Sequence, residues 1–296
     1  MRFGLAALIA TAIVAPAPLF AQNGRSLALS ADAVLLLDAE GKVLYAKNAE
    51  DDHAPASLVK LMTLYLAFED LEAGRVALED LAAISRHAAT TPRYRMGLRT
   101  GHRVPVRTLM EGVAIASAND AATALAEHLA GDEEAFVERM NEKGRAFGLT
   151  ATRFANPHGL PDPRQRTCAV DIAQLTTRLL QDYPASRTML GGQTFLFNGR
   201  LYARHIPLFN DPGGVQALKT GFTHEAGYNL SVAAWRDGVQ FMTVILGARS
   251  RSLSFLDAKK LLRYAFAATG LESAEPPPPK KERVVKRRAR RATAAK

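Results

Sequence analysis

The sequence predicts an α+β fold, with one antiparallel sheet of about five strands flanked by helices and a large helical insertion. Three observations support this. Strand-like alternation opens the chain, helix-like periodicity fills its middle, and strand-like alternation returns near the C-terminal end. Because sheet neighbours need not be close in sequence, we expect strands from both ends of the chain to share one sheet.

The strands of this sheet are expected in two groups. The first two are separated by a turn at Glu40-Gly41, and the last two flank Arg236-Asp237-Gly238, a typical hairpin signal. The expected strands are 31–37, 42–46, 215–220, 228–235 and 239–246.

The helical insertion begins with a segment that is apolar on all sides, 57–73. This pattern indicates a buried helix, and Pro55 before it and Gly74 after it are typical start and stop residues. Further helices are expected at 106–115, 120–129, 133–147 and 170–181, and a last one at 255–267.

The net charge of +9 is concentrated at the ends of the chain. Residues 280–296 carry nine Lys or Arg and one Glu, and Arg2 lies near the start, which leaves 28 basic and 28 acidic residues between them. The globular part is therefore not a cationic surface, and no nucleic-acid partner is expected. The basic tail is expected to contact an anionic membrane surface or a wall polymer, or to remain a solvated tail.

The chain is expected to divide into three parts. Residues 1–21 have the features of a secretion signal, with Arg2, an apolar run too short to span a membrane, and Ala21 before the cleavage point. Cleavage after Ala17, or a buried N-terminal helix, is the alternative. Residues 22–272 would form the catalytic domain. Residues 273–296 would be a proline-rich linker and a disordered basic tail. The protein is thus expected to be exported, periplasmic or extracytoplasmic.

Neither cysteine nor histidine indicates a metal site. Cys168 is the only cysteine, so it forms no internal disulfide, and the seven histidines show no ligand spacing. We therefore expect no metal and no cofactor.

Ser57-Leu58-Val59-Lys60 is the first motif with chemical potential. Residues three apart on a helix share a face, so Lys60 can act as a base for the Ser57 hydroxyl. The lysine must be neutral, and lowering its pKa from about 10.4 to about 7 requires about 4–5 kcal/mol. Burial in the apolar helix and a second cation, Lys219, both act in that direction. The alternative is that Ser57 and Lys60 are simply a solvated pair of side chains three residues apart on a helix.

Two further motifs follow. Ser117-Ala118-Asn119 lies between two expected helices, where Ser117 can relay a proton and Asn119 can bind substrate backbone; alternatively these residues cap a helix. Lys219-Thr220-Gly221 ends an expected strand, where it can receive a carboxylate, or can be an edge lysine before a turn. The order and spacing of the three motifs favour one joint site.

The sequence resembles the low-molecular-mass penicillin-binding proteins, the D-alanyl-D-alanine carboxypeptidases, from about residue 27 to 270. The matching segments are 55–63, 117–121, 156–162 and 219–223, with Ala226-Gly227. The resemblance implies a β-lactamase/DD-peptidase-like fold. It also implies peptidoglycan stem peptides as substrates, and β-lactams as covalent inhibitors.

The resemblance also implies roles for individual residues. Ser57 would attack the bond between two D-alanines, and Lys60 would take its proton. The backbone N–H groups of Ser57 and Phe222 would form the oxyanion hole. The substrate carboxylate would bind Lys219 and Thr220, with Gly221 and Thr223 in the same substrate-binding segment.

Some features leave alternatives open. Many family members have glycine where this chain has Ala118, and many have an amphipathic anchor helix, whereas residues 273–296 show no apolar face. A class A β-lactamase would need a deacylating glutamate, yet residues 143–161 contain no Asp or Glu, so slow release of penicillin is expected. A DD-endopeptidase and a catalytically silent peptidoglycan-binding protein remain alternatives to the carboxypeptidase.

Overall fold

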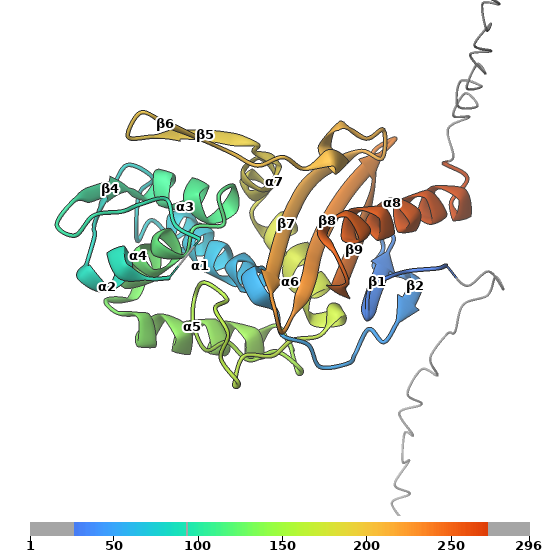
Figure 1. Cartoon of the computed structure of the whole chain (residues 1–296), viewed down its shortest axis with the longest axis horizontal. Helices are drawn as coiled ribbons and strands as arrows, with labels where there is room; N and C mark the ends of the chain where they lie inside the picture. The colour runs from blue at the N-terminus through green and yellow to red at the C-terminus, as the bar shows by residue number, and fades with distance from the viewer. Residues whose placement is uncertain (1–26, 93, 272–296) are drawn as a thin grey trace, which may run out of the picture.

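The computed structural model describes residues 27–92 and 94–271, and the N-terminal and C-terminal parts of the three-part division therefore lie outside the described residues. Within the described ranges, the chain forms a central sheet with helices on both faces and a helical region beside it (Figure 1).

The central sheet is antiparallel and five-stranded, as the sequence predicts. Its order in space is β2 (Val43–Lys47), β1 (Ala33–Leu37), β9 (Val239–Ala248), β8 (Gly227–Arg236) and β7 (Val215–Thr223). The N-terminal strands join the C-terminal ones where β1 pairs with β9. The expected hairpin is present, because Arg236 pairs with Val239 across Asp237 and Gly238, both at positive φ.

Each face of the sheet has its own core, because successive side chains of a strand point in opposite directions. Val34, Leu36 and Ile245 pack with the long helix α8 (Arg251–Ala268). Ala33, Leu35 and Val244 pack into the larger core, which includes α6 (Ala169–Asp182) and α1 (Lys60–Glu72). The sheet thus lies between α8 and the rest of the helices (Figure 1).

The helical region agrees with the prediction to within a few residues at each boundary. It contains α3 (Val106–Ala114), α4 (Asn119–Ala130) and α5 (Glu133–Ala146). One local difference concerns the expected helix 57–73. Its first turn is a 3₁₀ turn, η1 (Ala56–Val59), and the α-helix begins only at Lys60. Tighter turns of this kind are common at helix ends.

Several short elements were not predicted. They are α2 (Arg86–Thr90), α7 (Ala185–Gly191), η2 (Pro207–Asn210), the strand pair β3 (Leu81–Ala83) and β4 (Arg103–Pro105), and the hairpin of β5 (Thr194–Phe197) and β6 (Arg200–Ala203). The hairpin extends from the body of the molecule above α3 (Figure 1). One of its faces is anchored, since Tyr202 donates a hydrogen bond to the Met96 carbonyl.

Candidate active site

The nucleophile and base predicted from the sequence are in contact. Ser57 lies in η1, Lys60 opens α1, and the Lys60 Nζ lies 3.1 Å from the Ser57 Oγ. The same nitrogen donates to the Asn119 Oδ1 at 2.7 Å and to the His158 carbonyl. Lys60 is fully buried, and these three oxygens are the hydrogen-bond partners of its amine.

The environment of Lys60 favours the neutral amine. Burial lowers its pKa from 10.5 to about 7, against the opposing effect of the Asp120 carboxylate. We expected Lys219 to act as the second cation. The repulsion acts mainly on Lys219 itself, because burial first, and then the charges of Lys60 and Arg204, lower the Lys219 pKa well below its usual range.

The second motif joins the other two. Ser117 follows α3 with a positive φ of 55°, a conformation that costs a non-glycine residue free energy and is common at functional sites. Its hydroxyl accepts a hydrogen bond from the Lys219 Nζ at 2.9 Å. Asn119 opens α4, and no side chain caps this helix at Ala118. The alternative in which the motif serves only as a helix cap is therefore not supported.

The third motif lies on β7, at the edge of the sheet nearest η1. The Lys219 Nζ also donates to the Thr220 carbonyl at 2.9 Å. Gly221 lies so close to the nucleophile that a Cβ there would be 3.0 Å from the Ser57 nitrogen. Thr223 accepts a hydrogen bond from the Ala226 N–H at 2.9 Å, and its hydroxyl therefore stabilises the β7–β8 turn.

Phe222 points to the other face of β7 from Gly221, because side chains alternate along a strand. It is partly exposed, and its ring lies 4.3 Å from that of Tyr228, measured between centroids. The predicted role of Phe222 concerns its backbone N–H and not its side chain, so it stays a prediction.

The loop 156–162 contributes contacts that the sequence did not reveal. Besides the His158 carbonyl, the Pro157 carbonyl accepts a hydrogen bond from the Thr63 hydroxyl at 2.6 Å, so the loop is attached to α1 at two points. Gly159 has a φ of +87°, and a Cβ there would lie 2.0 Å from the Ala56 oxygen and 2.9 Å from the Ser57 nitrogen. Two glycines, Gly159 and Gly221, thus contact the nucleophile's peptide.

Asp120 has a structural role that the sequence motifs did not predict. Its buried carboxylate accepts hydrogen bonds from three consecutive N–H groups at 2.9–3.0 Å, those of Met96, Gly97 and Leu98. It thereby holds the segment before α3 against the start of α4, beside Asn119.

Arg204 is a second residue near the site that the sequence analysis did not single out. Its guanidinium donates to four backbone carbonyls around the third motif, those of Gly192, Leu218, Ala114 and Leu190. No carboxylate pairs with it among the ion pairs of the described residues, and burial lowers its pKa to about 10. This charge adds to the positive character around Lys219.

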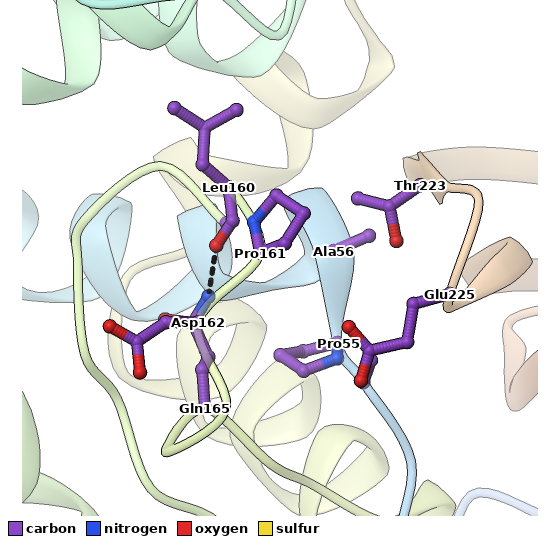
Figure 2. Close-up of a pocket in the computed structure, with 10 residues that line it drawn as sticks. Pro55, Ala56, Leu160, Pro161, Asp162, Gln165, Thr223 and Glu225 are labelled. Atoms are coloured by element: carbon purple, nitrogen blue, oxygen red, sulfur yellow. Dashed lines mark hydrogen bonds between the residues drawn. The ribbon is translucent and has the colours of Figure 1, made fainter.

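A pocket lies beside Ala56, the residue before the nucleophile (Figure 2). Leu160, Pro161 and Asp162 line one side and Thr223 and Glu225 the other, with Pro55 and Ala56 between them. The pocket beside Ala56 is therefore bounded by the 156–162 loop and by the end of β7.

Neither a metal site nor a membrane span is found in residues 27–92 and 94–271. No group of three or more potential ligands among them could hold a metal ion. None of the helices in these ranges is both long and apolar enough to cross a bilayer.

A serine and a lysine with a lowered pKa on one helical turn face a second serine–lysine pair, beside an antiparallel sheet. This arrangement defines the class of active-site-serine proteins with the β-lactamase/DD-peptidase fold. Within this class, the chain belongs to the D-alanyl-D-alanine carboxypeptidase family, whose profile matches residues 20–250.

Known relatives agree with this assignment. The chain is 37% identical to the D-alanyl-D-alanine carboxypeptidase DacC of Escherichia coli, over 80% of this chain and 62% of DacC. It is 34% identical to DacF of Bacillus subtilis, over 86% of this chain and 67% of DacF. The chain therefore spans about two thirds of the length of these curated relatives. It is also similar to the crystal structure of penicillin binding protein 5 from Haemophilus influenzae, with a TM-score of 0.80 and 33% identity over 82% of this chain and 72% of that one.

Two other similar proteins are matched over a larger share of their own length. A D-alanyl-D-alanine endopeptidase of Pseudomonas aeruginosa is 29% identical over 90% of this chain and 87% of that protein. Penicillin-binding protein D2 from Listeria monocytogenes, solved in a cefotaxime-bound form, matches with a TM-score of 0.71 and 28% identity over 82% of this chain and 99% of that one.

Proposed function

We propose that this protein is a serine-type D-Ala-D-Ala carboxypeptidase that removes the terminal D-alanine from peptidoglycan stem peptides through an acyl-enzyme. One observation carries the proposal. The Lys60 amine, with a pKa of about 7, lies within hydrogen-bonding distance of the Ser57 hydroxyl. An amine that is half neutral near neutral pH is matched to general-base catalysis.

The proposed reaction assigns a step to each motif. The Ser57 Oγ attacks the carbonyl of the penultimate D-alanine while the Lys60 Nζ takes the hydroxyl proton. The N–H groups of Ser57 and Phe222 stabilise the oxyanion. The Ser117 hydroxyl, bonded to Lys219, gives a proton to the leaving amine and takes one back from the Lys60 ammonium, which restores the neutral base as D-alanine departs. Water then hydrolyses the Ser57 ester, which releases the shortened peptide and regenerates the hydroxyl.

Substrate binding is assigned to the remaining residues. Asn119, besides holding Lys60, would bind the substrate backbone. Lys219 and Thr220 would bind the terminal carboxylate, since the Lys219 Nζ is a hydrogen-bond donor and the charge of Arg204 nearby favours an anion there. Gly221 would let the substrate backbone approach β7, and Thr223 would contact the acyl side from the pocket's edge.

The proposal is tested by mass spectrometry after incubation with a stem pentapeptide. The wild type should remove one D-alanine, and Ser57→Ala should remove none while retaining the wild-type melting temperature. Pentapeptide left intact by the wild type, under conditions where a fluorescent penicillin labels Ser57, would contradict carboxypeptidase activity.

DD-endopeptidase activity is a second candidate. The similarity to the Pseudomonas aeruginosa endopeptidase covers 87% of that protein, whereas the similarities to DacC and DacF cover 62% and 67% of theirs. Incubation with a cross-linked peptide dimer and with the pentapeptide, at equal concentrations, separates the two. Faster cleavage of the dimer would favour the endopeptidase.

Export and the terminal segments complete the proposal. We propose that residues 1–21 direct export and are removed, that 22–272 form the catalytic domain in the periplasm, and that the basic segment 280–296 contacts an anionic membrane surface or wall polymer. N-terminal sequencing of the exported protein tests the first part. Sedimentation of the full chain, and of a chain ending at residue 272, with anionic vesicles tests the last.

β-Lactams are proposed as covalent inhibitors that acylate Ser57.

A further inference from the structure

His158 is linked to both members of the nucleophile–base pair. Its carbonyl accepts a hydrogen bond from the Lys60 Nζ, and the next residue, Gly159, lies against the peptide bond between Ala56 and Ser57. The main chain around His158 therefore contacts the base through one atom and the nucleophile's backbone through the next residue.

The His158 side chain determines the shape of this turn. Its Nδ1 accepts a hydrogen bond from the Leu160 N–H at 3.2 Å, across the left-handed Gly159. Asn156 supports the same turn, since its Oδ1 accepts from the Gly159 N–H at 2.7 Å and its Nδ2 donates to the Leu160 carbonyl at 3.0 Å. The imidazole thus serves as a local acceptor for a backbone N–H.

The ring can play this part only when it is uncharged, because a protonated imidazole has no acceptor. Burial, then the charges of Lys60 and His87, lowers the pKa of His158 to about 3. The proton of the neutral ring is therefore on Nε2, which lies 3.8 Å from a Glu133 oxygen, too far for a hydrogen bond.

We propose that His158 is a positioning residue for acylation: its Nδ1 fixes the turn 158–160, and the turn sets the positions of the Lys60 amine and the Ser57 backbone N–H. The proposal rests on the proposed acyl-enzyme function and concerns a buried side chain whose hydrogen bond goes to the backbone of its own loop and not to Ser57. A small displacement of reacting groups is enough to slow such a step, since about 1 Å can cost about 100-fold in rate.

Three variants at this position test the role of Nδ1. In His158→Asn, the amide Oδ1 takes the place of Nδ1 and can accept from the N–H two residues on. In His158→Gln, the amide oxygen lies one carbon further away. His158→Leu keeps an apolar side chain without an acceptor. The rate constant for acylation by a fluorescent penicillin should fall about 10- to 100-fold in the Leu and Gln variants. In the Asn variant it should remain within about threefold of the wild type.

Several controls make the result decisive. Glu133→Gln alters the group near Nε2 and should leave acylation within about twofold of wild type. A peptide substrate should show the loss in the Leu and Gln variants in kcat rather than in KM, because the ring is buried and its hydrogen bond goes to the loop backbone. Melting temperatures identify a variant that fails to fold, and if Leu fails, the Asn–Gln contrast decides.

The proposal is overturned if Leu or Gln acylates within twofold of wild type, if Asn is as slow as they are, or if Glu133→Gln is equally slow. Release of D-alanine by the wild type is measured separately. Its absence, with penicillin acylation intact, counts against the carboxypeptidase proposal and leaves the positioning result standing.

Discussion

The pH dependence of acylation gives a direct measure of Lys60. Burial holds its pKa at about 7 instead of 10.5, and only the neutral amine can accept the Ser57 proton. About 10% of the amine is neutral at pH 6, about half at pH 7 and about 90% at pH 8. The acylation rate should therefore rise about tenfold from pH 6 to pH 8 and then level off.

An unperturbed lysine would give a different curve. With a pKa of 10.5, the rate would rise about 100-fold over the same interval and continue upward. The assay is the second-order rate constant for a fluorescent penicillin, measured in half-unit steps from pH 5.5 to pH 9.5, with circular dichroism confirming the fold at each pH. Lys60→Arg, which cannot lose its proton in this range, should abolish the plateau by abolishing acylation. A flat profile from pH 6 to pH 8, or a rate still rising tenfold per unit at pH 9, would refute the reasoning.

Three other outcomes are expected. Gly159→Ala should destabilise the fold by about 2 kcal/mol or more and slow acylation, because its Cβ would meet the Ala56 oxygen at 2.0 Å; Gly199→Ala, at a φ of +72° with open space around it, is the matched control and should cost less in urea unfolding. Asp257→Ala should cost about 2–4 kcal/mol by the same measurement, since its buried Oδ2 accepts from the Ser30 N–H and hydroxyl and the Ala31 N–H, and wild-type stability would contradict this. Nitrocefin should be turned over slowly, because residues 143–161 carry no carboxylate to activate water, and rapid catalytic turnover by the pure protein would make that prediction wrong.

The long elements were predictable because their apolar patterns reflect burial. The segment 57–73, with apolar residues on all sides, is the buried α1 with its 3₁₀ turn, and the Asp237-Gly238 signal marks a real hairpin. The β5–β6 hairpin was missed although Asn198-Gly199 lies at its turn. Leu196 and Leu201 face solvent there, so the apolar pattern did not indicate a buried face. The strands β3 and β4 are three residues long, too short for a periodicity to be recognised.

The side-chain contacts of the site were predictable from the sequence, whereas its backbone contacts were not. Ser57, Lys60, Asn119 and the Ser117–Lys219 pair are brought together as expected. The His158 carbonyl was not predictable, because every residue has a carbonyl and only the fold selects one. Asp120 and Arg204 were missed for a related reason, since both act on backbone groups of segments distant in sequence.

The pairing of β1 with β9 also bears on when the protein can fold. Ala33 lies opposite Leu246 in this ladder, so the two partners are separated by most of the chain. A ribosome that has made only the first three quarters of the protein has produced β1 and β2 without the neighbour that covers β1. Strand partners so remote in sequence slow folding, because a long loop must close first. The edge of β1 therefore stays uncovered until synthesis is nearly finished, so the five-stranded sheet can close only late in synthesis.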